Sequence, residues 1–234
     1  MKPKWPKVLP PLTPEGQRIS DDFMRRWHEQ LPGKFQMLER FNHGYPVRHG
    51  PKDFSSTLEI GAGIGGHLDH EELSLFQESQ YVAVEMREEM AAQMRIRHPG
   101  AWTLTDDCQK EIPFSNGTFD RIIAIHVLEH LPDLPSCIKE MRRLISPAGK
   151  FLIVIPCEGG MAYSMARAVS SRRMFEKLYR QSYDWFIERE HLNTPSEIME
   201  ELAPYFSVEH REFFPFRIPS VNLNLCIGLR LSPK

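Results

Sequence analysis

Residues 56–67 hold a short apolar run that contains an acidic side chain and is followed directly by four glycines. The glycines stand at positions 61, 63, 65 and 66, and Glu59 precedes the first of them by two residues. Glycines at this spacing let the backbone turn tightly, expose its N–H groups and approach a ligand closely. The stretch therefore predicts a nucleotide-binding loop between a strand and the N-terminus of a helix.

A second acidic residue, Glu85, ends the apolar run 81–85, 24 residues after Gly61. An acid at this place typically binds the ribose hydroxyls of a nucleotide. Gly61, Gly63 and Gly66 also fit G-x-G-x-x-G, the dinucleotide fingerprint of nicotinamide-binding folds. Glu85 thus supports nucleotide binding but does not distinguish one nucleotide from another.

Three further features do distinguish the ligand. Glu59 lies inside a strand where a nicotinamide enzyme keeps an apolar residue, and its carboxylate suits a ligand that carries an ammonium and a sulfonium. Residues 105–120 run from Thr-Asp-Asp-Cys into a Pro-Phe turn, and residues 126–133 read His-Val-Leu-Glu-His-Leu-Pro-Asp. With the glycine loop, these ordered motifs resemble the class I S-adenosylmethionine (SAM)-dependent methyltransferases of the small-molecule type, over residues 55–232.

The resemblance implies an α/β fold: a doubly wound, mostly parallel seven-stranded sheet with helices on both faces and a C-terminal antiparallel hairpin. It implies SAM as the cofactor, with Glu85 at the ribose, Asp107 at the adenine amino group and His126 at the methionine part. Asp106 competes with Asp107, because the spacing to Pro113 is one residue longer than the family pattern. The expected cofactor-binding residues are Glu59, Gly61, Gly63, Gly65, Glu85, Met86, Asp107, Cys108 and His126.

Two histidines are candidates for a general base, which methyl transfer needs only if the acceptor must lose a proton. His130 follows the fourth expected strand, and His191 follows a basic, aromatic segment. Histidine titrates near neutral pH and suits this role. Each also has a structural interpretation: His130 can orient its loop, and His191 can cap the next helix.

Two histidine patterns could suggest a metal ion, but we expect no metal site. Residues 126–130 match the H-x-x-E-H signature of zinc hydrolases, yet His126 ends a buried β run and Pro132 interrupts any helix. His67 and His70 flank Asp69. We expect this second group on the solvated face of the helix that follows the glycine loop.

The elements that must position these residues alternate from residue 56 onward, as a parallel sheet requires. The N-terminal region 1–54 is expected to hold a Pro-rich, poorly ordered extended arm, a helix from 14 to about 30 ended by Pro32-Gly33, a short helix over 34–41 and a turn-rich linker over 42–53. Residues 55–234 are expected to form the SAM-binding domain. Its expected strands lie near 56–60, 81–85, 101–105, 119–126, 150–156, 205–213 and 221–231, and its helices near 66–78, 87–98, 133–146 and 195–202.

A helical insertion over about 159–190 interleaves basic and aromatic residues. It can be an amphipathic helix pair with charged outer faces, or a lid over the acceptor. As a lid it would suit an anionic, amphiphilic or lipid-linked acceptor and leaves peripheral membrane contact open. The N-terminal helices and a turn at Tyr45–Arg48 are expected to close over the cofactor.

The composition is that of an ordinary globular protein, with 234 residues, 41% hydrophobic and 26% charged. A net charge of −2 gives no attraction to nucleic acid. The four cysteines are widely separated and are expected to be reduced thiols. No apolar run reaches the roughly 18 residues of a membrane span, and no signal peptide is apparent, so we expect a cytoplasmic location.

These patterns favour an enzyme that transfers a methyl group in line from SAM to a small-molecule or lipid-like acceptor. One alternative is a non-catalytic protein that binds SAM or S-adenosylhomocysteine. Another is a protein or RNA methyltransferase, although no Asn/Asp-Pro-Pro-aromatic tetrapeptide follows the fourth strand. The acceptor, the choice among O-, N- and C-methylation, and the oligomeric state stay open.

Overall fold

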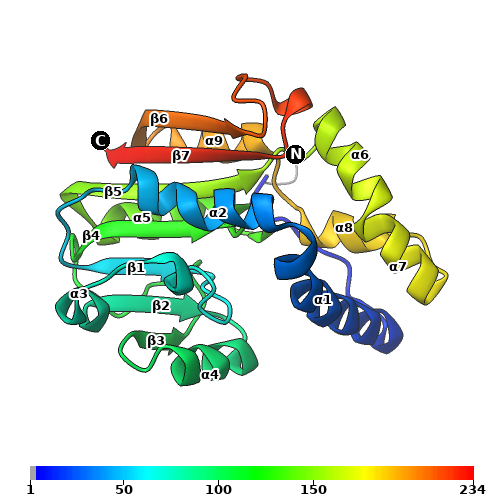
Figure 1. Ribbon diagram of the computed structural model, residues 1–234, viewed down its shortest axis with the longest axis horizontal. Coiled ribbons are helices and arrows are strands. Elements are labelled where there is room, and N and C mark those ends of the chain that lie inside the picture. Colours follow the sequence, from blue (N-terminus) through cyan, green and yellow to red (C-terminus); the bar gives the residue numbers. More distant parts are fainter. Residues whose placement is uncertain (1–3) are drawn as a thin grey trace.

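A seven-stranded sheet organises the molecule, which the computed structural model describes over residues 4–234, side chains of 27–34 excepted. The strand order is β3-β2-β1-β4-β5-β7-β6. Strands β1 to β5 pair in parallel, and β7 runs antiparallel to both β5 and β6 (Figure 1). This confirms the expected doubly wound sheet with a C-terminal antiparallel hairpin. The strands are β1 (Thr57–Ile60), β2 (Tyr81–Glu85), β3 (Trp102–Thr105), β4 (Phe119–Ile125), β5 (Ile145–Pro156), β6 (Phe206–Phe214) and β7 (Cys226–Pro233).

The central strands form because their residues are apolar on both faces. Ile122 and Ile123 of β4, and Ile153 of β5, are completely buried, as expected of strands covered on both sides. One face packs against α5 (Leu134–Leu144), whose Ile138 and Met141 belong to the main hydrophobic core. This packing fixes the strand ends from which the functional loops emerge.

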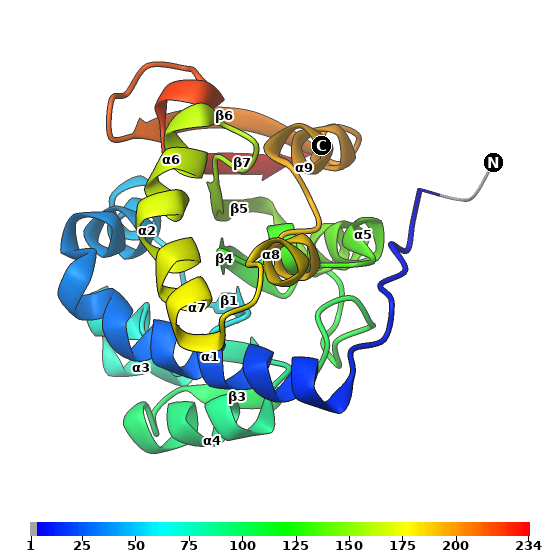
Figure 2. The same cartoon turned by 90° about the vertical axis from the view of Figure 1, so that its right-hand side faces the viewer.

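Helices cover both faces of the sheet, as Figure 2 shows. The helices α2 (Gln36–His49) and α3 (Leu75–Ser79) lie on one face, and α5 and α9 (Pro195–Leu202) lie on the other. The remaining crossover helix, α4 (Glu88–Arg97), connects β2 to β3. Thr194 caps α9 reciprocally with Glu197, which confirms the helix expected at 195–202.

Four further helices lie beyond the carboxyl ends of the parallel strands (Figure 1). An aromatic cluster joins them: the Phe23 ring of α1 lies 5.1 Å from that of Phe175 and 5.0 Å from that of Phe186. The insertion therefore shares a small core with the N-terminal helix, and its role as a lid stays a prediction. Among the helices that the structure describes, none has the length and apolar character needed to cross a bilayer. The four helices beyond the strand ends are α1 (Pro14–Lys34), α6 (Met161–Val169), α7 (Ser171–Tyr179) and α8 (Asp184–Glu190).

The N-terminal region is more helical than the sequence indicates. The turn-rich linker expected over 42–53 is wrong for residues 42–49, because α2 continues to His49 with Pro46 inside it; only residues 50–53 of it belong to the connection toward β1. Proline removes a helical hydrogen bond, but Phe41 and Tyr45 are buried against the sheet, and tertiary burial of this kind overrides helix propensity. Tyr45 lies against Gly228 of β7, on a face of the sheet instead of over the glycine loop. The first helix also extends further than expected, because the Pro32-Gly33 pair lies within the last turn of α1.

Residues 4–13 of the N-terminal arm are extended, as expected of its prolines, but they are fixed to the domain and not poorly ordered; residues 1–3 of the expected arm lie outside the described residues. Lys7 Nζ donates to the carbonyl of Leu192 at 2.7 Å and to Glu197 at 2.8 Å. Trp5 Nε1 donates to Glu201 at 2.9 Å. These contacts attach the arm to α9 and to the segment before it.

The segment after the glycine loop is not the helix expected over 66–78. It forms a turn and a short 3-10 helix (Leu68–His70), and α3 begins later. His67 Nε2 lies 2.9 Å from Glu71 Oε1, and Glu71 pairs with the buried Arg121 at 2.8 Å. Because these buried contacts hold the segment on the sheet, His67 and Glu71 do not belong to a solvated helix face, and that expectation is wrong.

Candidate functional site

Apart from Glu59, which lies inside β1, the predicted cofactor-binding residues gather at one edge of the sheet. They follow the carboxyl ends of β1, β2, β3 and β4, which are neighbours in the strand order. The order reverses between β1 and β4, and ligands of open α/β sheets bind in the crevice outside such a reversal. Residues spread over half the sequence therefore lie around one place because of the topology.

The glycine loop takes conformations that require glycine. Gly61, Gly63 and Gly65 have φ values of +63°, +57° and +83°, in the left-handed region that other residues rarely adopt. A side chain at Gly61 would overlap Val127, and one at Gly65 would overlap Met94 and His98. A Cβ at Gly63 would meet nothing within 4 Å, so the loop is closed by packing at two glycines and open at the middle one.

Glu85 links the end of β2 to this loop. The carboxylate is buried and accepts the backbone N–H of Gly63 at 2.9 Å and that of Arg87 at 2.9 Å. Each oxygen has a second lone pair for another donor. The next residue, Met86, is 65% exposed and adds apolar surface beside the loop. Glu85 thus positions the glycine loop and keeps acceptor capacity for a ligand hydroxyl.

Glu59 has a different environment from the one its place in the motif indicates. Its side chain is buried within the sheet and accepts the hydroxyl of Tyr81 at 2.7 Å. Burial raises the pKa of Glu59 to about 8, so the carboxyl is mainly neutral at pH 7. Its expected contact with a ligand ammonium stays a prediction.

The raised pKa of Glu59 makes stability depend on pH. Between its ordinary pKa, near 4.5, and about 8 the unfolded chain ionises while the folded chain stays protonated, so stability is lost as pH rises. Glu59→Gln removes this titration and keeps an acceptor for Tyr81. We expect the variant to gain about 1.4 kcal/mol relative to the wild type per pH unit within that window. Urea unfolding from pH 5 to pH 8 measures the difference, and a difference that does not vary with pH would contradict the assignment.

The loop after β3 orders two acidic side chains through local hydrogen bonds. Asp106 Oδ1 accepts the N–H of Asp107 at 2.8 Å, and Asp107 Oδ1 accepts the backbone and side-chain N–H groups of Gln109 at 3.0 Å. Lys110 Nζ lies 3.7 Å from Asp107 Oδ2. The neighbouring Cys108 is buried. Both acids lie at the expected strand end, and the choice between them as the adenine ligand stays a prediction.

His126 ends β4 in a strained conformation. Its φ of +53° lies in the left-handed region, which costs a non-glycine residue about 1–3 kcal/mol and is found often at functional sites. Its Nδ1 lies 3.0 Å from Glu129 Oε1 and its Nε2 lies 3.8 Å from Cys226 Sγ. Burial opposes protonation, but these two neighbours raise the pKa of His126 well above its usual value.

The two candidate bases lie side by side. The rings of His130 and His191 are 5.1 Å apart. His130 Nδ1 lies 2.5 Å from the carbonyl oxygen of Glu190, which can only accept, so we assign the proton of the neutral ring to Nδ1. Burial lowers the pKa of His130 to about 4, although the Glu129 carboxylate opposes the change. His130 is therefore a weak base that is mainly neutral at pH 7.

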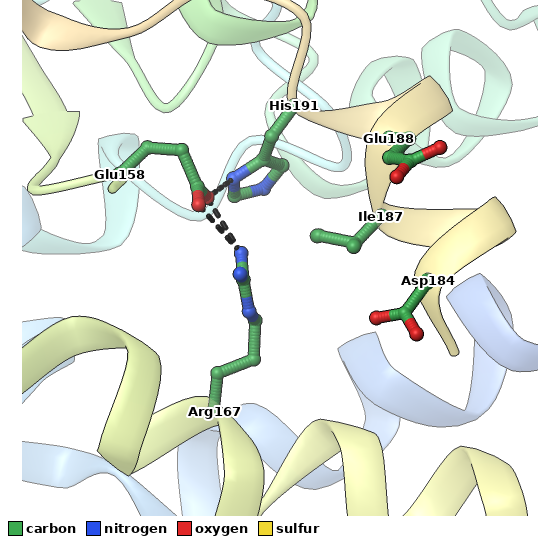
Figure 3. Close-up of a pocket in the computed structure, with 6 residues that line it drawn as sticks. All are labelled: Glu158, Arg167, Asp184, Ile187, Glu188 and His191. Carbon is green, nitrogen blue, oxygen red and sulfur yellow. Dashed lines mark hydrogen bonds and ion pairs between the residues drawn. The ribbon is translucent and has the colours of Figure 1, made fainter. Parts of the chain in front are cut away.

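His191 forms a carboxylate–imidazole pair at a small pocket (Figure 3). Its Nδ1 lies 2.6 Å from Glu158 Oε2, and Arg167 Nη1 donates to both Glu158 oxygens at 2.8 and 2.7 Å. Burial opposes ionisation of Glu158, but these partners lower its pKa to about 2. The pocket has a volume of about 200 Å³ and also touches Ile187 of α8. The ionised carboxylate therefore accepts a hydrogen bond from Nδ1–H of His191 and fixes the orientation of its ring.

Residues 58–153 match a family described as a methyltransferase domain. This stretch is about two fifths of the chain, whose fold is that of the class I methyltransferases. Its fold is that of solved structures such as a SAM-dependent methyltransferase from Thermotoga maritima, described as a possible histamine N-methyltransferase. That structure has a TM-score of 0.61 and 18% identity and is matched over 93% of this chain and 99% of that one. A TehB-like SAM-dependent methyltransferase from Corynebacterium glutamicum has a TM-score of 0.60 and 12% identity, and the match covers 93% of this chain and 100% of that one.

Curated relatives of the methyltransferase domain include sterol-modifying enzymes. Sterol 4-C-methyltransferase strm-1 of Caenorhabditis elegans is 36% identical over 143 residues, 59% of this chain and 38% of that protein. Cycloartenol-C-24-methyltransferase 1 of Oryza sativa is 28% identical over 141 residues, 58% of this chain and 40% of that protein. The matched region is thus about two fifths of the length of these relatives.

SAM is the expected cofactor of the methyltransferase domain, and the loop geometry fits it. Gly63 leaves open space above the loop, and Glu85 keeps free lone pairs beside it. Met86 and Ile64, which are 65% and 37% exposed, border the same loop with apolar surface. Among the described side chains, no group of three or more His, Cys, Asp or Glu residues is arranged to hold a metal ion.

Sequence reasoning about the methyltransferase domain missed Glu158. It follows β5, whose carboxyl end lies at the same edge as those of β1 and β4, and this position was the available signal. The sequence gives no sign that Glu158 contacts His191, because the two residues are 33 positions apart. Arg167 was expected only as one of the basic residues of the insertion, whereas it contacts Glu158 directly.

Proposed function

We propose that this chain is a SAM-dependent methyltransferase with a small, lipid-like acceptor that loses a proton during the reaction. The observation that carries the proposal is the His191–Glu158 pair at the pocket, next to His130 and the loop after β4. The sterol methyltransferases among the relatives support an apolar acceptor. Bound SAM supplies an electrophilic methyl group, whose bond to sulfur breaks as the acceptor atom bonds to its carbon.

In this proposal, the loops at the strand ends hold the cofactor. Gly63 provides the open space, Glu85 accepts from the ribose hydroxyls, and the loop after β3 contacts the adenine. His126 lies toward the methionine part, where a protonated imidazole suits a carboxylate. The proposed cofactor contacts are Glu59, Gly61, Gly63, Gly65, Glu85, Met86, Asp107, Cys108 and His126.

His191 is the proposed general base. Glu158 fixes its proton on Nδ1 and can stabilise the imidazolium that forms when Nε2 takes the acceptor's proton, as a carboxylate does in catalytic triads. Arg167 keeps Glu158 ionised and oriented. His130 is a poorer base because its pKa is about 4, and we propose that it positions the loop through Glu190.

The test is an assay with methyl-labelled SAM. Hydroxylated isoprenoids, sterols and phenolic lipids are offered in detergent, beside protein and RNA substrates, and products are analysed by mass spectrometry. A labelled lipid-like product is expected. SAM binding with no product in any class would instead favour a non-catalytic binding protein, and a label only in protein or RNA would contradict the proposed acceptor.

Glu85→Ala tests the cofactor site. We expect SAM binding to weaken by about 1–3 kcal/mol, because hydrogen bonds to a charged group are lost. Isothermal titration with SAM measures this change. Glu88→Ala is a matched control, since Glu88 is an exposed acid of α4 that pairs with Arg95, and its SAM affinity should equal that of the wild type. Unchanged affinity in Glu85→Ala would remove Glu85 from the site.

A further inference from the structure

Helix α6 has two faces with different surroundings. Tyr163 and Arg167 point to the site, where Arg167 contacts Glu158 and the Tyr163 ring stacks 6.2 Å from that of His191. The other face carries Met161, Met165 and Val169, which are 61%, 65% and 75% exposed. Their spacing of four residues places them in one stripe. One wall of the pocket thus presents an apolar stripe to the outside.

A neighbouring loop adds to this apolar surface. The connection between β6 and β7 contains a 3-10 helix (Val221–Leu223) that packs against α6, as Figure 2 shows. Large apolar side chains are exposed along this connection: Phe216 at 63%, Ile218 at 49% and Leu223 at 41%. Apolar exposure gathered on a loop and on the helix that packs against it marks an interaction surface. We name as the docking face Met161, Met165, Val169, Phe216, Ile218 and Leu223.

Basic side chains accompany the docking face. Helix α7 follows α6 after one residue and carries Arg173 and Lys177, and Arg180 comes directly after it. All three are exposed, and none is ion-paired with any residue that the structure describes. Arg217 lies between Phe216 and Ile218 in the loop. The segment 161–183 holds five basic residues and one acidic residue, while the whole chain has a net charge of −2. Positive charge is therefore concentrated beside the apolar stripe.

We propose that the docking face binds the surface of a membrane that contains anionic lipids. Apolar side chains that enter the headgroup boundary, with cations beside them, are the combination that holds a protein at such an interface. The helix α6 would then separate the bilayer from the pocket by one helix diameter. Membrane binding itself does not depend on the proposed function. Only its purpose rests on that function: a lipid-like acceptor would reach the pocket from the membrane without crossing water.

Vesicle sedimentation tests this surface with the full chain, without SAM or acceptor. The wild type is expected to sediment with vesicles of equal parts phosphatidylcholine and phosphatidylglycerol, less with phosphatidylcholine alone, and less at high salt. Met161→Ser/Met165→Ser should weaken binding at least about tenfold, since several buried CH₂ groups are lost. Leu75→Ser is the matched control, because Leu75 is 86% exposed on the distant α3, and should bind like the wild type.

Charge is tested separately with Arg173→Glu/Lys177→Glu, which should abolish the preference for anionic vesicles. Wild-type protein that stays in the supernatant with both vesicle types would overturn the inference. A dimer in solution that Met161→Ser/Met165→Ser dissociates, without vesicle binding, would assign the docking face to a second copy of the chain. Because methyl transfer is assayed in detergent, failure of docking and failure of the proposed function give different results.

Discussion

His191→Ala is expected to lower kcat about 10²- to 10⁴-fold, the usual contribution of a general base, while the affinity for SAM stays unchanged. The variant loses the imidazole that the Glu158 carboxylate orients at the pocket. Cofactor affinity should not change, because the proposed cofactor contacts lie on the loops after β1 to β4. Single-turnover kinetics with the acceptor found in the lipid panel measures the chemical step, and titration with SAM measures binding.

Two other histidines make this result specific. His130→Ala should cause a smaller loss than His191→Ala, because a group with a pKa of about 4 is a weak base at pH 7. His210→Ala is a distant control on β6, where its ring contacts the hydroxyl of Tyr45 at 3.0 Å, and kcat should stay at the wild-type value. A larger loss in His130→Ala would transfer the role of base to His130. Equal activity of His191→Ala and wild type would show that the acceptor needs no base.

The sheet could be predicted because its strands are set by local pattern. Continuous apolar runs such as 122–125 and 151–155 are typical of central strands. The carboxyl ends of parallel strands meet at one edge, so the residues after them lie together without any knowledge of side-chain contacts. For the same reason, the sequence placed Gly61, Glu85 and His126 around one site.

The contacts that define the chemistry were harder to predict because they join distant parts of the chain. Glu158 meets His191 across 33 residues, and His130 meets Glu190 across 60. The orientation of Glu59 was also hidden, since both faces of its strand are buried and only the structure pairs it with Tyr81. A local rule such as the spacing of acids and glycines carries no information on these pairings.

The segments that were wrongly predicted share a physical cause. Residues 66–74 carry polar residues at helical spacing, but His67 and Glu71 find buried partners and hold the chain against the sheet. Residues 42–49 carry turn formers, but burial of Tyr45 keeps them helical. In both, tertiary contacts outweigh the local preference, which is the general limit of propensity as evidence.

Gly63→Leu is expected to weaken SAM binding by roughly 10²-fold or more, about 3 kcal/mol. Gly63 is the loop position where a Cβ meets nothing within 4 Å, so an added side chain projects into the space assigned to the cofactor and does not disrupt the core. Its N–H donates to Glu85 at 2.9 Å, which keeps the loop in place beneath the new side chain. Titration with SAM measures the loss.

The conformational strain of this substitution can be separated from its effect on the cofactor space. Gly63 has a φ of +57°, and a leucine there costs about 1–2 kcal/mol of stability. Gly117 has a φ of +67° in the turn before β4, at the end of that strand away from the cofactor loops. A Cβ added at Gly117 would make only ordinary van der Waals contacts. Gly117→Leu should therefore lose similar thermal stability and bind SAM like the wild type. If both variants bind SAM equally well, the open space above Gly63 does not hold the cofactor, and the glycine loop is only a tight connection between β1 and the segment after it.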